Sequence, residues 1–230
     1  MAVTDLKVIS IGDSFLYGLE LQDWGSQPSQ LTWPALYAKY LQAEYQCLAK
    51  SAHSSQYVLR TLLASLHEQT QPCFYIIHWP SAIRTEYFSK TANDWVQITG
   101  TSIMNRVEGE SELVQKAYYS IVNSLLGDKL HNLLMIYTAV QALKSSHHKF
   151  AMSVVDEQDF LYNKDLYDPE YVTFLQTHTE KYIHWFDGMT FHAWSKHNQW
   201  PEGPWGHPLE QAHAQAFEYF KDIYNSIITI

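Results

Sequence analysis

The sequence predicts an α/β protein with three layers (α/β/α), in which helices cover both faces of a mostly parallel central sheet. Short apolar runs of strand length alternate with longer runs of helical periodicity, which is typical of parallel βαβ units. The run Cys73–Trp79 (CFYIIHW) is almost wholly apolar, as expected for a strand with both faces covered. No linker, internal repeat or low-complexity segment divides the chain, so we expect residues 1–230 to form one domain.

The first half of the chain is predicted to supply three strands and two helices. Proline suits the first turn of a helix, so Trp33-Pro34 marks the start of the first helix. The second helix carries Leu59, Leu62 and Leu66 on one face. In chain order, these elements are a strand at Leu6–Ile11, a helix from Trp33 through Tyr45, a strand at Tyr45–Ala49, a helix at Ser55–His67 and a strand at Cys73–Trp79.

The second half is less regular. Residues 81–110 include WVQITGTSI, which predicts a small excursion or hairpin. A helical pattern then runs from Ser111 to about Ser145, with a break expected near Gly127-Asp128. Lys149–Val155 is the fourth predicted strand, and a tryptophan-rich, loop-like region follows it. The last helix is predicted to begin at Pro208.

Composition excludes several classes of function. The chain is 46% hydrophobic and 17% charged, which is typical of a packed globular protein. Its net charge of −9 argues against a nucleic-acid partner, because phosphate binding needs concentrated Lys and Arg. No apolar stretch approaches the ~18–20 residues of a membrane span, and MAVTDLKVIS has no signal-peptide pattern, so we expect a cytoplasmic location.

The residues that often bind metals show no ligand spacing. Cys47 and Cys73 lie in apolar, strand-like runs and are expected to be buried thiols. The twelve histidines contain no HxH or HxxxH pair. The sequence therefore predicts neither a metal nor an organic cofactor.

The stretch VISIGDSFLYG places Asp13 and Ser14 directly after the first predicted strand. In open parallel sheets ligands bind beyond the carboxyl ends of the strands. A serine there can act as a nucleophile if a histidine base and oxyanion donors lie nearby. Serine and aspartate are also ordinary turn and N-cap residues, so the tripeptide alone is weak evidence.

The other end of the chain carries a matching histidine. His207, in GPWGHPLEQAH, precedes the proline that opens the last helix, so the imidazole is expected in a loop at the sheet edge. His213 falls inside the helix and is expected to pack or face solvent. His192 and His197 also lie in loops and remain alternative bases.

Together, IGDSFLYG and GHPLEQAH resemble the first and last motif blocks of the SGNH (GDSL-type) hydrolases. The intervening TWPALYAKYL and AKSAHSSQYVLRTL are also similar to a subgroup of this family. The resemblance implies a flavodoxin-like sheet and a serine esterase or acyl hydrolase. It places Ser14 in the position of the nucleophile, which also supplies an oxyanion amide, and His207 in that of the general base.

Two oxyanion blocks depart from the family pattern. The second block usually supplies a glycine amide, but this sequence has Ser51-Ala52-His53-Ser54-Ser55. Any amide except that of proline can donate, so Ala52 is the candidate donor. The third block usually supplies an asparagine, whereas the strand here runs into His78-Trp79-Pro80-Ser81. A hydroxyl of Ser55 or Ser54 is the candidate replacement.

The orienting acid also departs from the family pattern. The family has an aspartate three residues before the histidine, where this chain has Pro204. Glu202 is the candidate third member, with Asp187 and Asp13 as further options. A backbone carbonyl can fix the histidine tautomer without an acid, so we favour a Ser–His dyad.

Substrate contacts are predicted just beyond the third strand. Arg84 and Trp79 lie near the candidate nucleophile there, and Arg84 could bind an anionic group or form a surface pair with Glu86. The tryptophan-rich region could form an aromatic wall, although packing over the sheet edge is the more common role.

The sequence thus predicts a serine ester hydrolase acting through an acyl-enzyme on a small ester, acyl or acetylated-sugar substrate. The alternative is a binding protein on the same fold that has lost catalysis and holds a carbohydrate or acyl ligand. A nucleotide- or flavin-binding protein is disfavoured, because the chain has no glycine-rich phosphate loop. The sequence leaves the oligomeric state open.

Overall fold

A computed structural model describes residues 6–99, 103–104, 107–155 and 169–229. Its central sheet has the strand order β2-β1-β3-β7, and all neighbouring strands are parallel. The strands are β1 (Lys7–Ile11), β2 (Glu44–Cys47), β3 (Cys73–Trp79) and β7 (Lys149–Val154). Every residue of β3 is buried, as its apolar sequence predicts.

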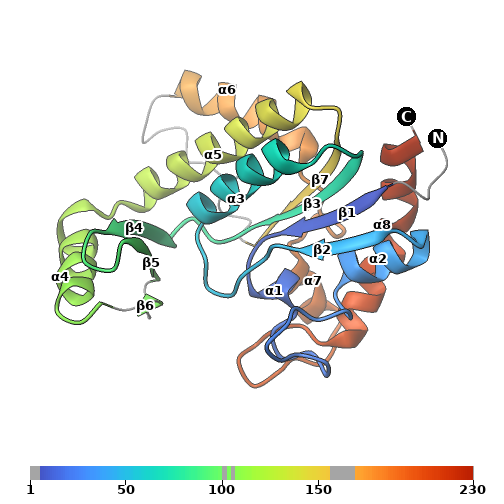
Figure 1. Cartoon of the computed structure of the whole chain (residues 1–230), viewed down its shortest axis with the longest axis horizontal. Coiled ribbons are helices and arrows are strands. Elements are labelled where there is room, and N and C mark those ends of the chain that lie inside the picture. The colour runs from blue at the N-terminus through green and yellow to red at the C-terminus, as the bar shows by residue number, and fades with distance from the viewer. Residues whose placement is uncertain (1–5, 100–102, 105–106, 156–168, 230) are drawn as a thin grey trace.

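Helices cover both faces of this sheet (Figure 1). On one face, side chains of the sheet form a core with α3, α5 and α6. On the other face they pack against α2, α7 and α8. The predicted three-layer α/β class is confirmed. The bounds of these helices are α2 Trp33–Leu41, α3 Ser55–Glu68, α5 Leu125–Ser145, α6 Pro169–Thr179, α7 Phe191–His197 and α8 Glu210–Thr229.

Several element ends differ from the sequence-based predictions for local reasons. Helix α2 stops at Leu41 because Gln42 takes a left-handed conformation with φ of 55°. The helical break lies at Asn123-Ser124, where the Ser124 side chain caps α5, so Gly127-Asp128 fall in the first turn of α5. Before the break, α4 (Glu110–Ala117) continues into a π-helical turn, Tyr118–Val122.

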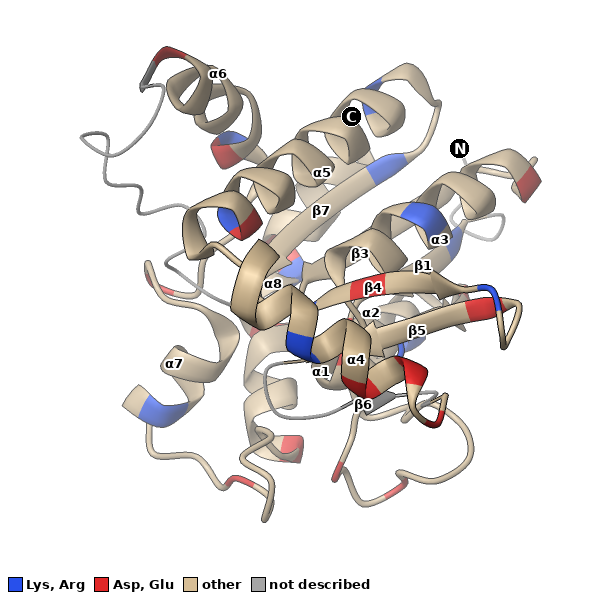
Figure 2. Cartoon of the chain, turned by 90° about the vertical axis from the view of Figure 1, so that its left-hand side faces the viewer, with Lys and Arg blue, Asp and Glu red and all other residues tan. Residues whose placement is uncertain are grey.

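The excursion after β3 is a separate antiparallel sheet with the order β4-β5-β6. Its strands are β4 (Thr85–Ser89), β5 (Asp94–Ile98) and β6 (Ile103–Met104). Figure 2 looks onto this sheet, and on this side of the molecule Lys and Arg segments are scattered among Asp and Glu segments.

The chain reverses direction across the sheet at β1. From β1 it passes to β2 on one side, then crosses to β3 on the other side. The carboxyl end of β1 is therefore the topological switch point of the sheet, the usual place for a ligand. Ser14 follows this strand. No helix among the described residues is long and apolar enough to span a membrane.

Candidate functional site

Ser14 is the first residue of α1 (Ser14–Tyr17), immediately beyond the switch point. The turn into α1 needs Gly12, because a Cβ there would lie 2.8 Å from the carbonyl oxygen of His78 in β3. Asp13 caps the helix by accepting a hydrogen bond from the amide of Phe15 at 3.1 Å. These contacts fix the backbone that carries Ser14. Only 6% of the surface of Ser14 is exposed.

The second carboxylate oxygen of Asp13 is also occupied. Arg84 donates to it at 2.8 Å, and the Asp13 side chain is fully buried. Asp13 is thus tied to the backbone after Ser14 and to Arg84. This arrangement leaves Asp13 unsuited to orient His207, although it anchors the excursion sheet to the Ser14 turn.

His207 lies in the loop before α8, next to the segment that carries Ser14. Its ring packs edge-on against the ring of Phe15, with centroids 5.5 Å apart. Its Nδ1 lies 2.7 Å from Oε2 of Glu20. When Nδ1 carries the proton for this bond, Nε2 is left with a lone pair, the form that a general base requires.

His213 has a structural environment instead. It is 1% exposed, and its ring stacks on Trp33 with centroids 5.4 Å apart. Burial, with the nearby His78 and His207, lowers the pKa of His213 to about 3. This imidazole therefore stays neutral inside the fold, as expected for a packed helical residue.

Glu20 is the carboxylate partner of His207 and was not anticipated from the sequence. Its oxygens also accept hydrogen bonds from the amide of Trp205 at 2.9 Å and from the amide of His207 at 3.3 Å. Burial alone would raise the pKa of Glu20, but these amide bonds and the His207 contact lower it below its usual value. Glu20 is therefore held as a carboxylate beside the imidazole.

The backbone at Glu20 is strained, and the facing loop makes room for its side chain. Glu20 has φ of 72°, in the left-handed region that residues with side chains rarely adopt. A Cβ at Gly203 would lie 2.5 Å from Cδ of Glu20, so a side chain there would displace the carboxylate from its present position. The one sequence signal for Glu20 is its isolation, since it is the only charged residue between Ser14 and Asp23.

Glu202, the predicted orienting acid, has different partners. Its Oε1 lies 3.1 Å from Nε2 of His192, and its Oε2 lies 4.0 Å from Nζ of Lys196. The carboxylate that contacts His207 is therefore that of Glu20, whereas Glu202 contacts side chains of α7. Asp187, the other option, bonds the indole of Trp194 and the hydroxyl of Tyr219.

The segment predicted to be the second oxyanion block lies between β2 and α3 and contains a residue with left-handed backbone. Ala52 has φ of 61°, so it adopts the left-handed conformation that usually favours glycine. Ser54 caps α3 by accepting from the amide of Tyr57 at 3.3 Å, a bond that does not use the proton of its hydroxyl. The hydroxyl of Ser55 is buried without a hydrogen-bond partner among the described residues.

Of the two predicted substrate contacts, Trp79 is buried and Arg84 is partly exposed. Trp79 is fully buried, and its indole donates to the sulfur of Met152 at 3.4 Å, so it belongs to the core and cannot meet a substrate. Arg84 is partly exposed beside Asp13. Glu86 does not pair with Arg84, since its buried carboxylate bonds Arg60 and Gln97.

The tryptophan-rich region contributes both core and surface. Trp194 is 6% exposed and packs against Phe186, whereas Trp205 is 67% exposed. Trp205 meets the ring of Trp24 edge-on, with centroids 5.8 Å apart. Within the described part of the chain, no three His, Cys, Asp or Glu side chains gather as a metal-binding group.

Comparison with known proteins supports the fold. No protein-family model and no curated protein sequence matches the chain significantly. Solved structures do match. The psychrotrophic esterase EstA from Pseudoalteromonas sp., described as inhibited by monoethylphosphonate, is 12% identical over 97% of this chain and 96% of its own, with a TM-score of 0.50. A putative lipolytic protein of the G-D-S-L family from Desulfitobacterium hafniense is 12% identical over 94% and 98%, with a TM-score of 0.51.

A carbohydrate esterase family 2 enzyme with a carbohydrate-binding domain, from Corynascus thermopiles, gives a TM-score of 0.54. It is 11% identical and covers 97% of this chain and 67% of its own. At these identities the likeness concerns the fold. The chain has the mostly parallel, helix-covered sheet of the GDSL-type (SGNH) esterases.

Proposed function

We propose that this chain, as one domain, is a serine ester hydrolase in which Ser14 is the nucleophile, His207 the general base and Glu20 the orienting acid. The observation that carries the proposal is the 2.7 Å contact between Nδ1 of His207 and Glu20, beside the turn that presents Ser14. The fold shared with esterases supports the same reaction class. The sequence favoured a Ser–His dyad, whereas we propose a triad whose acid, Glu20, lies far from His207 in the sequence.

The reaction proceeds through two acyl transfers. Nε2 of His207 takes the proton of Ser14 as Oγ attacks the ester carbonyl, and the same proton then passes to the leaving alcohol. Water, deprotonated by His207, attacks the acyl-enzyme and releases the acid and the Ser14 hydroxyl. Glu20 holds Nδ1–H and stabilises the imidazolium formed in each step.

The oxyanion formed at the carbonyl needs hydrogen-bond donors. The amide of Ser14 is one proposed donor, and the amide of Ala52 or a neighbour is the other. The left-handed conformation of Ala52 supports this role, because strained backbone is often found where a site demands an unusual amide direction. Ser55 stays a proposed hydroxyl donor. The chemistry uses protein groups alone, so we propose no cofactor.

The substrate is proposed to be a small ester, an acyl compound or an acetylated sugar. Carbohydrate esterases among the structures of the same fold support the last class. The competing function is ligand binding without catalysis, which the departures at the oxyanion blocks favour. The two differ in one property, the reactivity of Ser14.

The test is hydrolysis of 4-nitrophenyl acetate by the wild-type protein and by Ser14→Ala, His207→Ala and His213→Phe. We expect kcat to fall by about 10³-fold or more in the first two variants, because either loss removes the activated nucleophile. His213→Phe should stay within a few-fold of wild type, because this buried ring lies outside the triad. Full activity in Ser14→Ala, or greater loss in His213→Phe than in His207→Ala, would contradict the proposal.

A further inference from the structure

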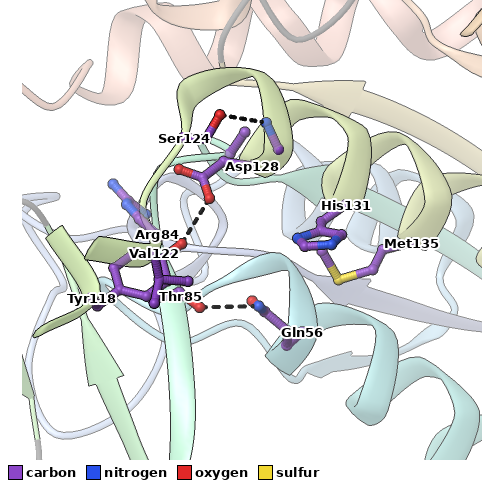
Figure 3. A pocket seen from close by; sticks show the side chains of 11 residues that line it. Gln56, Arg84, Thr85, Tyr118, Val122, Ser124, Asp128, His131 and Met135 are labelled. Carbon is purple, nitrogen blue, oxygen red and sulfur yellow. Dashed lines mark hydrogen bonds between the residues drawn. The ribbon is translucent and has the colours of Figure 1, made fainter. Parts of the chain in front are cut away.

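A pocket of about 250 Å³ lies between the first turn of α3, the start of β4 and the first turns of α5 (Figure 3). Two of its residues connect it to the proposed catalytic site. Arg84 donates a hydrogen bond to Asp13, directly before Ser14, and Gln56 directly follows Ser55. The side chains that define its chemistry are those of Gln56, Arg84, Thr85, Tyr118, Asp128 and His131.

One wall of the pocket presents a buried carboxylate. Asp128 is 7% exposed and accepts hydrogen bonds from the hydroxyl of Tyr118 at 2.7 Å and from Nδ2 of Asn123 at 2.6 Å. No cationic side chain of the described residues forms an ion pair with it. Both of its donors are neutral groups, and its two oxygens have lone pairs left to accept further hydrogen bonds.

The floor of the pocket holds a second acceptor, and this one has no partner. Gln56 donates through Nε2 to the hydroxyl of Thr85 at 3.2 Å, which fixes the orientation of the amide. Its Oε1 is buried and has no hydrogen-bond partner among the described residues. A buried acceptor without a partner is costly, so the site favours a ligand that donates a hydrogen bond to it.

Arg84 supplies donors on the same side. One Nη1 contact goes to Asp13 at 2.8 Å, and a guanidinium has five N–H groups, so the others can serve a ligand in the pocket. The Asp13–Arg84 pair is neutral as a unit, yet the cation itself faces the pocket. The pocket therefore offers strong acceptors and strong donors together.

This combination selects among the ester alcohols that could enter. An anionic group would be repelled by Asp128. A cationic group would leave the remaining N–H groups of Arg84 without an acceptor, since an ammonium only donates. An alkyl chain would cover Oε1 of Gln56 and the carboxylate of Asp128 without bonding either of them. A neutral group with several hydroxyls satisfies both acceptors and both kinds of donor, since each hydroxyl donates and accepts.

We infer that this pocket binds the hydroxyl-rich alcohol portion, a sugar or polyol, of the ester that Ser14 cleaves. The inference rests on the proposed function, because it assumes that Ser14 cleaves an ester. It deepens that function by naming the class of alcohol in the substrate. Gln56 and Asp128 bind sugar hydroxyls, and Arg84 joins this recognition to the nucleophile turn through Asp13.

The binding test measures saturation-transfer NMR signals for methyl glucoside, methyl xyloside and glycerol. It compares the wild type with Ser14→Ala, Gln56→Met and a matched surface control, Gln215→Met, on α8. We expect transfer to at least one probe in the wild type, Ser14→Ala and Gln215→Met, and a loss of several-fold in Gln56→Met. Absence of transfer to all three probes, or equal signals in Gln56→Met and Gln215→Met, would overturn the inference.

The kinetic test holds the acyl group constant and varies the alcohol. The substrates are 6-O-acetylglucose, ethyl acetate and acetylcholine, compared by kcat/KM. We expect the sugar ester to be preferred by about tenfold or more, and Gln56→Met to lower that preference by about tenfold. Equal use of ethyl acetate or a preference for acetylcholine would overturn the inference.

The two tests separate the inference from the proposed function. If no ester is hydrolysed while the probes still bind in a Gln56-dependent way, the pocket assignment stands and the proposed function fails. If all three esters are hydrolysed without an effect of Gln56, the proposed function stands and the pocket assignment fails.

Discussion

At the scale of single residues, two side-chain-bearing positions of the candidate site have left-handed backbone. Glu20 and Ala52 have φ of 72° and 61°. A residue with a Cβ costs about 1–2 kcal/mol more than glycine in this region. One position presents the carboxylate that meets His207, and the other lies in the proposed oxyanion block. Strained backbone therefore coincides with two places where the sequence departs from the SGNH motif pattern.

The strain at Ala52 gives a prediction about stability. Ala52→Gly should raise the free energy of unfolding by roughly 0.5–1 kcal/mol, since relief of left-handed strain exceeds the added chain entropy of the unfolded state. Urea denaturation at pH 7 measures the change.

The matched control is Ala64→Gly in the middle of α3, where alanine is exposed and helical. That variant should lose roughly 0.5–1 kcal/mol. Equal losses in the two variants would show that Ala52 is not strained in solution.

The places of Ser14 and His207 in the fold could be predicted from the sequence, whereas the acid beside His207 could not. Ser14 and His207 stand in short motifs at strand and helix ends, so their positions at the sheet edge could be inferred locally. Glu20 could not be inferred, because its contact with His207 spans 187 residues and depends on a loop that folds back across Gly203. Glu202 lies closer to His207 in sequence, but its carboxylate meets His192.

At the scale of elements, the β4–β5 hairpin is tied to the loop before α3. Gln97 in β5 accepts a hydrogen bond from the amide of Ser54 at 3.1 Å and donates to the buried carboxylate of Glu86. Arg60 of α3 bonds the same carboxylate and stacks over Trp95, 4.2 Å from its ring centroid. The hairpin thus holds the segment that contains Ala52, the proposed oxyanion donor.

Removing this connection should affect turnover. Gln97→Met leaves the amide of Ser54 and the carboxylate of Glu86 each short of a partner. We expect kcat for 4-nitrophenyl acetate to fall by about tenfold with a small change in KM, because the oxyanion loop loses its support.

Tyr87→Phe is the control on the same hairpin, since its hydroxyl bonds Ser111 at 3.2 Å and not the loop. It should leave kcat within about twofold. An equal loss of kcat in both variants would show that the hairpin acts only through general stability.

The strands of this hairpin could not be predicted individually from the sequence, in contrast to most strands of the central sheet. The strands β1, β3 and β7 were recognisable because burial on both faces leaves apolar runs. In the excursion sheet burial does not follow polarity, since Phe88 is 48% exposed while Glu86 and Gln97 are buried, so the sequence pattern was too mixed to define strands. Helix α6 was not predicted, because its apolar positions are few, and it packs against α5.

At the scale of the whole molecule, two buried neutral histidines couple stability to pH. Burial lowers the pKa of His78 to about 4 and that of His213 to about 3. In the unfolded chain the pKa of histidine is about 6.5. Below that pH the unfolded state binds protons that the folded state does not. The free energy of unfolding must therefore fall as the pH falls from about 6.5 toward 4.

Each buried histidine contributes a slope of about 1.4 kcal/mol per pH unit in this window. His213→Gln should remove about half of the combined slope, measured by urea denaturation at several pH values between 7 and 4. The exposed His67→Gln is the control and should leave the slope unchanged. The same slope in His213→Gln and the wild type would contradict the buried, neutral state of His213.

The central claim is that Glu20 orients His207 to activate Ser14, and one comparison tests it most directly. The measurement is kcat at saturating 4-nitrophenyl acetate for Glu20→Gln and Glu202→Gln, two changes that each remove one carboxylate charge while conserving side-chain size. The account predicts a loss of about 10³–10⁴-fold for Glu20→Gln. It predicts a loss below about tenfold for Glu202→Gln, whose carboxylate lies on His192. Near-wild-type turnover in Glu20→Gln, or the larger loss in Glu202→Gln, would contradict the account.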